Sequence, residues 1–277
     1  MSLAQDLRIA TELARAAGAI ALSHYGKVER LTKTHAATTL EAVTDADRAT
    51  QRHIVAGIRR RFPDDGIIGE ENETGDAITF ECEHPMGRNW VIDPIDGTNN
   101  FIAGLGNFGV CVGLLDQGMP VLGVVYDVTR DLMYAAAVGE GAWVGTRRMR
   151  ALDTPMSDSS MLMLTSNLID GTGRCPQWAC QWLGQTTWKT RILGSAALEA
   201  VYVAAGVAHG AVTVNGKLWD AAAPAAILLE SGATITDLSG RPIFPFSLAN
   251  YSGAKVPFLA AGRAAHPVLL QQIRSNP

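Results

Sequence analysis

The sequence carries little charge and has no apolar run suited to crossing a membrane. Only 18% of its 277 residues are Asp, Glu, Lys or Arg, below the ~25% of an average globular chain, so a large interior or a covered interface is expected. The uncharged stretch 200–216 is interrupted by Gly, His and Asn and is shorter than a membrane span. The N-terminal region has the mixed charges of an amphipathic helix, not the pattern of a signal peptide. We therefore expect a cytoplasmic protein without membrane contact.

Cysteine and basic clusters are also scarce. Four cysteines in a chain of this length do not form a disulfide framework, and none has the His or Cys partners of a zinc site at the usual spacing. A net charge of −4 without a block of like charges gives no nucleic-acid footprint. The 47% of hydrophobic residues suffices for the core of one large or two ordinary domains.

The hydrophobic pattern divides the chain into two portions. Three-to-four spacing of apolar residues predicts helices over 3–22 and 44–62, with Thr44 as the cap of the second. Residues 27–40 between them predict a hairpin or mobile loop, and residues 106–138 a β-meander. After residue 153, strands alternate with helices; strands are expected at 161–165, 189–192, 210–214, 233–236 and 256–260, and helices at 177–183, 196–208, 221–229 and 267–274. This pattern predicts two α/β portions whose sheets stack between helix layers.

Two aspartates follow a short buried strand expected at residues 90–92. The strand is expected to stop at Asp93 and Pro94, and Asp96 and Gly97 follow in a turn. Two bare charges about 4 Å apart repel by about 4 kcal/mol at an effective dielectric of about 20. A bound divalent cation would turn that repulsion into attraction. The alternative is an Asx-turn with a solvated Asp96.

Three further acidic sites also lie at the ends of regular elements, where α/β proteins build their functional sites. Glu70 follows the strand at 67–69, Asp47 lies in the first turn of the second helix, and Asp220 stands at the entrance of an apolar helix. For Asp220 alone, a helix N-cap is the alternative. None of the six histidines lies in these motifs. Such an all-oxygen set favours Mg²⁺ first and Mn²⁺ second over zinc.

The order of these motifs resembles the inositol monophosphatase family of lithium-sensitive, Mg²⁺-dependent phosphatases. G-E-E stands at 69–71, W-V-I-D-P-I-D-G-T-N-N-F at 90–101 and W-D-A-A at 219–222. The resemblance implies an α/β fold: a five-layered αβαβα sandwich of the inositol monophosphatase/fructose-1,6-bisphosphatase type. Residues 1–152 would form an N-terminal α+β portion with the mobile loop, metal site and meander, and residues 153–277 an α/β portion that completes the cleft. It further implies a homodimer that hydrolyses a small phosphomonoester with metal-activated water.

The resemblance also implies roles for individual residues. Glu70, Asp93 and the carbonyl of Ile95 would bind the first Mg²⁺; Asp93, Asp96 and Asp220 would bind the second; and a third, weaker ion would lie close to Glu70. Thr98, with Asp47 hydrogen-bonded behind it, would orient the attacking water, which Glu70 also contacts.

Two glycine-containing stretches are expected to bind the phosphate. Gly97–Thr98 and Gly194–Ser195–Ala196 each begin a helical turn, where free N–H groups suit an anion. For Gly194–Ser195, an ordinary turn with a Ser cap is the alternative. The residues expected to contact the substrate are Asp96, Gly97, Thr98, Gly194, Ser195, Ala196, Thr213, Lys217 and Asp220.

The identity of the alcohol is left open by three departures from the family pattern. Thr213, with Lys217 nearby, stands where inositol-selective members carry a Glu. The usual lysine of the mobile loop has no counterpart at its normal spacing, and Lys33 lies further upstream. The polar stretch after Glu71 contains Glu81, Cys82, Glu83 and His84, which we interpret as a solvated loop and not as a second metal site. Histidinol phosphate, a sugar bisphosphate or a 3′-phosphoadenosine nucleotide are alternative substrates on the same fold. An alternative of another class is a regulatory protein that binds transcription machinery or RNA, although no nucleic-acid partner is expected from the acidic balance.

Overall fold

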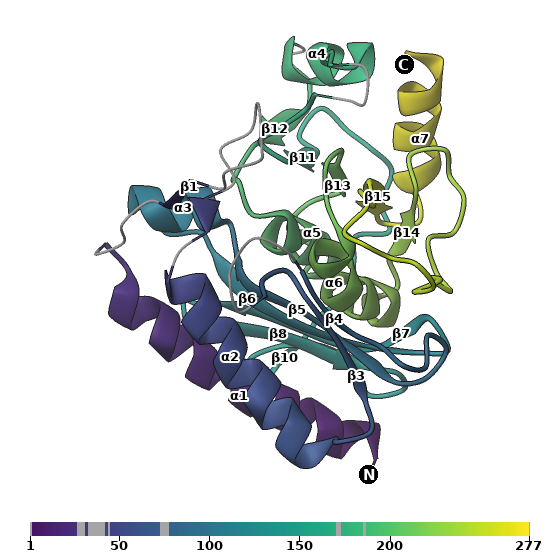
Figure 1. The fold of residues 1–277 in the computed structure, drawn as a ribbon. Helices are drawn as coiled ribbons and strands as arrows, with labels where there is room; N and C mark the ends of the chain where they lie inside the picture. The colour runs from purple at the N-terminus through teal and green to yellow at the C-terminus, as the bar shows by residue number, and fades with distance from the viewer. Residues whose placement is uncertain are drawn as a thin grey trace.

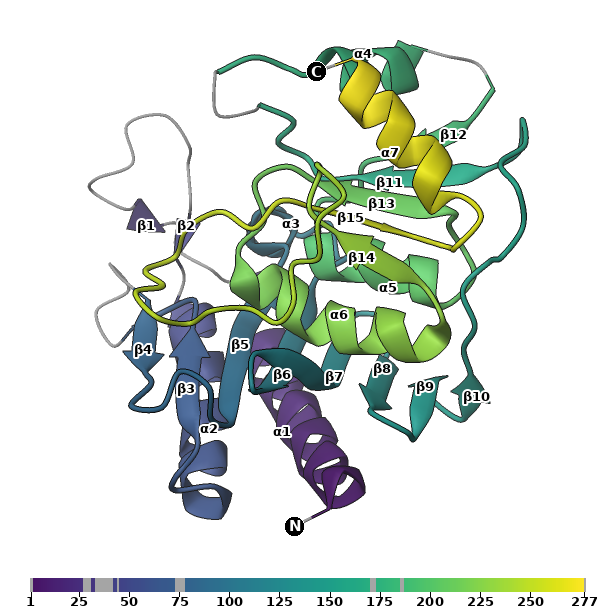
Figure 2. The same ribbon diagram turned by 90° about the vertical axis from the view of Figure 1, so that its right-hand side faces the viewer.

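The chain folds into stacked layers of helices and sheets. The computed structural model describes residues 2–26, 31–32, 42–43, 45–72, 78–169, 173–184 and 187–276. Two helices cover an eight-stranded sheet, two more lie between it and a five-stranded sheet, and two cover the outer face of the latter (Figure 1 and Figure 2). Three clusters of buried apolar residues fill the spaces between these layers. The expected αβαβα sandwich is confirmed.

The first layer consists of α1 (Leu3–His24) and α2 (Asp45–Arg61), close to the predicted ranges. Small residues allow the two helices to approach: a Cβ added to Gly57 would lie 2.2 Å from Leu13. The short strands β1 (Leu31–Thr32) and β2 (Ala42–Val43) pair antiparallel, as in the hairpin expected there. Thr44, the expected helix cap, and Lys33 lie outside the described residues.

The eight-stranded sheet contains the expected meander and three strands that were not predicted. Its order is β10-β9-β8-β7-β6-β5-β3-β4. The strands are β3 (Gly66–Gly69), β4 (Thr79–Glu81), β5 (Asn89–Asp96), β6 (Gly109–Asp116), β7 (Met119–Asp127), β8 (Leu132–Ala137), β9 (Gly141–Val144) and β10 (Arg147–Arg148). The unpredicted strands β4, β9 and β10 lie at the two edges, and all are short and partly exposed. They lack the apolar alternation by which strands are recognised.

Strand β5 does not stop at Asp93 and Pro94, so that expectation is wrong. All of its residues up to Asp96 are buried. Asp93 lies opposite Cys111 on β6 and Asp96 opposite Gly109, so β5 has one extra residue between the two pairs. Such a bulge accommodates Pro94, which has no N–H for the ladder. The bulge keeps both aspartates on one continuous, buried strand.

The other elements follow the predicted alternation, with shifted ends. The second sheet has the order β12-β11-β13-β15-β14. Its strands are β11 (Met161–Leu164), β12 (Lys189–Arg191), β13 (Gly210–Thr213), β14 (Thr234–Thr236) and β15 (Phe258–Ala261), and the helices are α3 (Thr98–Ala103), α4 (Gln177–Gly184), α5 (Ala196–Ala204), α6 (Leu218–Ser231) and α7 (His266–Ser275). Helix α5 ends earlier than predicted and α6 begins three residues earlier, because Leu218 and Trp219 are buried as part of its first turn.

Two glycines let α6 lie directly on the eight-stranded sheet. Gly113 on β6 and Gly123 on β7 are paired neighbours. A Cβ added to Gly113 would lie 2.8 Å from the Ala223 nitrogen, and a Cβ added to Gly123 would lie 2.0 Å from the Ala223 oxygen. Only residues without a side chain permit this approach. The contact fixes the first turns of α6, and with them Asp220, over the sheet.

Across the described ranges, no helix combines the length and apolarity that crossing a bilayer requires.

Candidate metal and phosphate site

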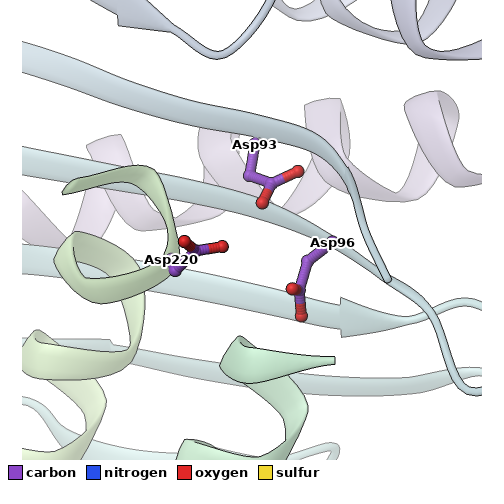
Figure 3. Close-up of side chains that lie close together, drawn as sticks. All are labelled: Asp93, Asp96 and Asp220. Carbon is purple, nitrogen blue, oxygen red and sulfur yellow. The ribbon is translucent and has the colours of Figure 1, made fainter. Parts of the chain in front are cut away.

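Three aspartates converge at one end of β5. Asp93 and Asp96 come from the bulged end of that strand, and Asp220 reaches toward them from the start of α6 (Figure 3). One carboxylate oxygen from each lies within 4.8 Å of the other two. Asp93 and Asp96 are only 2% and 5% exposed. The structure therefore brings together three of the expected metal ligands, and Asp96 is not the solvated carboxylate of the Asx-turn alternative.

Asp93 is at the centre of the negative charge. Burial and the charges of Glu70, Asp96 and Asp220 raise its pKa well above the usual value. The carboxyl groups of Glu70 and Asp220 lie close enough to share a proton with it. Glu70 follows β3 and is held beside β5 because its N–H donates to the Ile92 carbonyl at 3.2 Å. Glu70 thus joins the cluster, as expected.

Asp96 is held by the first turn of α5. The Ala196 N–H donates to its Oδ1 at 3.1 Å, the Ala197 N–H to its Oδ2 at 2.9 Å, and the Ser195 hydroxyl to the same Oδ2. Burial raises the pKa of Asp96, and these bonds lower it. The expectation of a free N–H group is therefore wrong for Ala196, and the N–H of Ala197 is occupied as well. Ser195 does cap the helix, accepting from the Leu198 N–H at 3.3 Å.

Asp220 is the third residue of α6, not its N-cap. Its Oδ2 accepts the backbone N–H of Lys217 at 2.6 Å, which closes the first turn of the helix. Burial and then the charge of Asp96 raise its pKa to about 7. The ammonium of Lys217 lowers that pKa, and it also donates to the Gly253 carbonyl. Lys217 is therefore half-buried beside the cluster and not directed to solvent.

The carboxylate cluster fits a hard divalent cation. The charges of Glu70, Asp96 and Asp220 raise the pKa of Asp93, and that of Asp96 raises the pKa of Asp220, as expected where negative charges are crowded together in a buried place. Oxygen donors are what Mg²⁺ and Mn²⁺ bind. Glu70, Asp93, Asp96 and Asp220 could hold such ions, and the buried Ile95 lies between the two strand aspartates.

The two glycine-containing stretches lie against each other. Gly97 has a left-handed φ of +91°, and a Cβ there would lie 3.3 Å from the Gly194 oxygen. The hydroxyl of Thr98 donates to the Ile95 carbonyl at 3.0 Å, so Thr98 lies beside the expected metal ligand. Asp47 is buried in the first turn of α2. Its hydrogen bond to Thr98 stays a prediction.

Thr213 lies at the end of β13, next to Asp220. Both side chains border Gly216. A Cβ added to Gly216 would lie 2.5 Å from the Thr213 methyl carbon and 3.5 Å from Asp220 Oδ2. Thr213 is buried. A residue at this position can therefore influence what binds beside Asp220.

Glu199 and Gln51 support the site but were not singled out in the sequence. Glu199 accepts the N–H groups of Leu193 and Gly194. Gln51 on α2 binds the backbone of Glu71 in both directions, with its oxygen 3.1 Å from the Glu71 nitrogen. The sequence offered one indication of these roles: each is a polar side chain among the apolar residues of its helix.

Comparison with known proteins gives a consistent result. The model of the inositol monophosphatase family matches residues 2–277. A Thermotoga maritima protein named fructose-1,6-bisphosphatase/inositol-1-monophosphatase is 36% identical over 243 residues, covering 87% of this chain and 88% of its own. A Pasteurella multocida protein named Nus factor SuhB is 34% identical, with 84% and 85% covered. The solved structure of a Thermotoga maritima IMPase superposes with a TM-score of 0.82 at 32% identity, covering 98% and 97% of the two chains.

Proposed function

The chain belongs to the inositol monophosphatase family and is a phosphoric monoester hydrolase, and from this premise we propose that it is a Mg²⁺-dependent enzyme for a small phosphorylated alcohol. The observation that carries the proposal is the convergence of Asp93, Asp96 and Asp220 within 4.8 Å. A buried cluster of this kind stores electrostatic repulsion that a divalent cation relieves.

We assign Glu70, Asp93 and the Ile95 carbonyl to a first ion, and Asp93, Asp96 and Asp220 to a second. A third, weaker ion would lie close to Glu70, and Mn²⁺ would substitute. When bound, the ions activate the attacking water and stabilise charge on the phosphoryl oxygens and the leaving alkoxide.

The residues around the cluster would position the substrate and the water. Thr98 donates its hydroxyl proton to the Ile95 carbonyl, so its oxygen is left to accept from the attacking water. Asp47 and Glu70 would complete that orientation. The N–H groups at Gly97 and Thr98 would bind the phosphate, with the adjoining Gly194 and Ser195 forming the opposite wall.

The alcohol would be selected beside Asp220. Thr213 is neutral and short, so it offers ring hydroxyls a weaker acceptor than a Glu. Lys217 brings a positive charge suited to a substrate with a second anionic group. We therefore propose that inositol 1-phosphate is a poor or middling substrate and that another phosphomonoester gives a higher kcat/KM.

The remaining proposals rest on the family resemblance. We propose a cytoplasmic homodimer, lithium-sensitive, with no membrane or nucleic-acid partner. We also propose the division at residues 152 and 153. In support, the eight-stranded sheet ends at β10 before this point and the five-stranded sheet begins at β11 after it.

A phosphatase assay over a panel of phosphomonoesters tests the proposal. Wild type should need Mg²⁺, and Asp96→Asn should lose at least roughly 10–100-fold in turnover at saturating Mg²⁺, as for other losses around metal sites. Asp158→Asn, at an exposed loop residue, is the control. Near-full turnover of Asp96→Asn would refute the metal assignment. A wild type inactive on the whole panel that captures RNA polymerase or ribosomal RNA stoichiometrically would favour the regulatory alternative.

A further inference from the structure

A buried glutamate holds the loop that precedes α5. The side chain of Glu199 is 1% exposed, and its Oε1 accepts the N–H of Leu193 at 2.7 Å and of Gly194 at 3.0 Å. Within the described part of the chain, no group hydrogen-bonds its buried Oε2. Burial raises the pKa of Glu199 to about 8. The fold thus accepts an unfavourable buried carboxyl whose hydrogen bonds to described residues all go to this loop.

The same loop is held from its opposite side by two amides. Asn100 Nδ2 and Asn107 Nδ2 donate to the Leu193 carbonyl at 2.7 and 2.8 Å. Gly194 has a φ of +78°, and a Cβ there would lie 3.0 Å from the Asn100 amide nitrogen. The peptide between Leu193 and Gly194 is therefore fixed by both its N–H and C=O groups.

The residues that follow this peptide are those that hold Asp96. Ser195, Ala196 and Ala197 all donate to the Asp96 carboxylate. A shift of the loop would move these three donors together. The orientation of Asp96 toward Asp93 and Asp220 consequently depends on where α5 begins.

We propose that Glu199 is a positioning residue for the metal site: it fixes the Leu193–Gly194 peptide, and through the first turn of α5 it orients the Asp96 carboxylate. The inference rests on the proposed function, since it concerns the second ion. Glu199 acts through backbone N–H groups, so a neutral acceptor of the same size performs the same task.

Direct binding of Mn²⁺ to the metal-free full chain, measured by electron paramagnetic resonance and by calorimetry, tests the inference. Glu199→Ala should weaken Mn²⁺ binding about 10–100-fold, as expected for a residue that supports a ligand. Glu199→Gln should restore most of the affinity, because its amide oxygen can accept both N–H groups. The matched control is Glu230→Ala on α6, where the carboxylate likewise accepts two backbone N–H groups, those of Gly139 and of Gly141 at the start of β9. It should bind Mn²⁺ as wild type does.

Three outcomes would overturn the inference. The first is a folded Glu199→Ala variant that binds Mn²⁺ with wild-type affinity. The second is a Glu199→Gln variant whose Mn²⁺ affinity is as low as that of the alanine variant. If Glu199→Ala does not fold, Glu199→Asp decides, because its shorter side chain cannot reach both N–H groups; undiminished binding there contradicts the proposal. A wild type that binds no Mn²⁺ would instead overturn the proposed function, and the inference with it.

Discussion

Replacing Asp220 by Asn should stabilise the metal-free protein while it weakens the metal site. Burial, and after it the charge of Asp96, raises the pKa of Asp220 to about 7, from an ordinary value of 3.8. The folded state therefore holds a proton that the unfolded state releases, and stability falls as the pH rises between these two values. Asn carries no charge, and its oxygen can still accept the Lys217 N–H that closes the first turn of α6.

The size of the effect follows from the shift in pKa. About three units at 1.36 kcal/mol each give on the order of 4 kcal/mol when both states are fully titrated, at about pH 8. At about pH 5 the folded state still keeps its proton, so the difference in free energy of unfolding between variant and wild type shrinks to about 2 kcal/mol. Each kcal/mol moves the Tm of a chain of this size by roughly 2–4 °C.

Urea unfolding in EDTA at both pH values provides the measurement, with Asp158→Asn as the exposed control. Adding Mg²⁺ at the higher pH should then stabilise wild type more than the variant, since a ligand stabilises only the state that binds it. An equal difference in free energy of unfolding between variant and wild type at both pH values would refute the electrostatic reasoning. A variant less stable than wild type at the higher pH would do the same.

Three other predictions concern cation choice, substrate and packing. Ca²⁺ should fail to support turnover, because it prefers more ligands at longer distances than Mg²⁺, and millimolar Li⁺ should inhibit where equal Na⁺ does not; full activity in Ca²⁺ contradicts this. Thr213→Glu should raise kcat/KM for inositol 1-phosphate relative to the best substrate of the panel by roughly 10–100-fold, and a wild type that already prefers inositol 1-phosphate argues against it. Gly123→Ala should lower the free energy of unfolding by about 1–3 kcal/mol and weaken Mn²⁺ binding. The control Gly184→Ala, whose added Cβ would meet open space, should change neither stability nor Mn²⁺ binding.

The sequence was sufficient to predict that the carboxylates of Asp93, Asp96 and Asp220 gather. Asp93 and Glu70 each follow a short apolar run, and the ends of such strands meet at one edge of a sheet. Apolar periodicity likewise predicted α1, α2 and the alternating second half, with errors of a few residues at their ends. The helices and strands depend on neighbours in the chain, which is why a single sequence reveals them. That Asp220 joins the other aspartates was implied by the family resemblance.

The contacts that could not be predicted are those between residues far apart in the chain. Asp96 and the first turn of α5 are about a hundred residues apart, and their hydrogen bonds occupy N–H groups that local reasoning left free for phosphate. The continuation of β5 past Pro94 depends on how β6 pairs with it. Edge strand β4 has three residues, too few for a recognisable pattern, and it forms by pairing with β3.

The repulsion within the cluster explains why each aspartate is held by a different element. Asp93 lies on the bulged strand β5, Asp96 is bound by the first turn of α5, and Asp220 is carried by α6. Carboxylates that raise one another's pKa would separate or remain protonated if their backbones could move. The layered fold prevents the separation, because α5 and α6 are buried between two sheets and α6 rests directly on Gly113 and Gly123. The rigidity of these helices, and not an attraction among the side chains, therefore keeps the donors together until a cation binds.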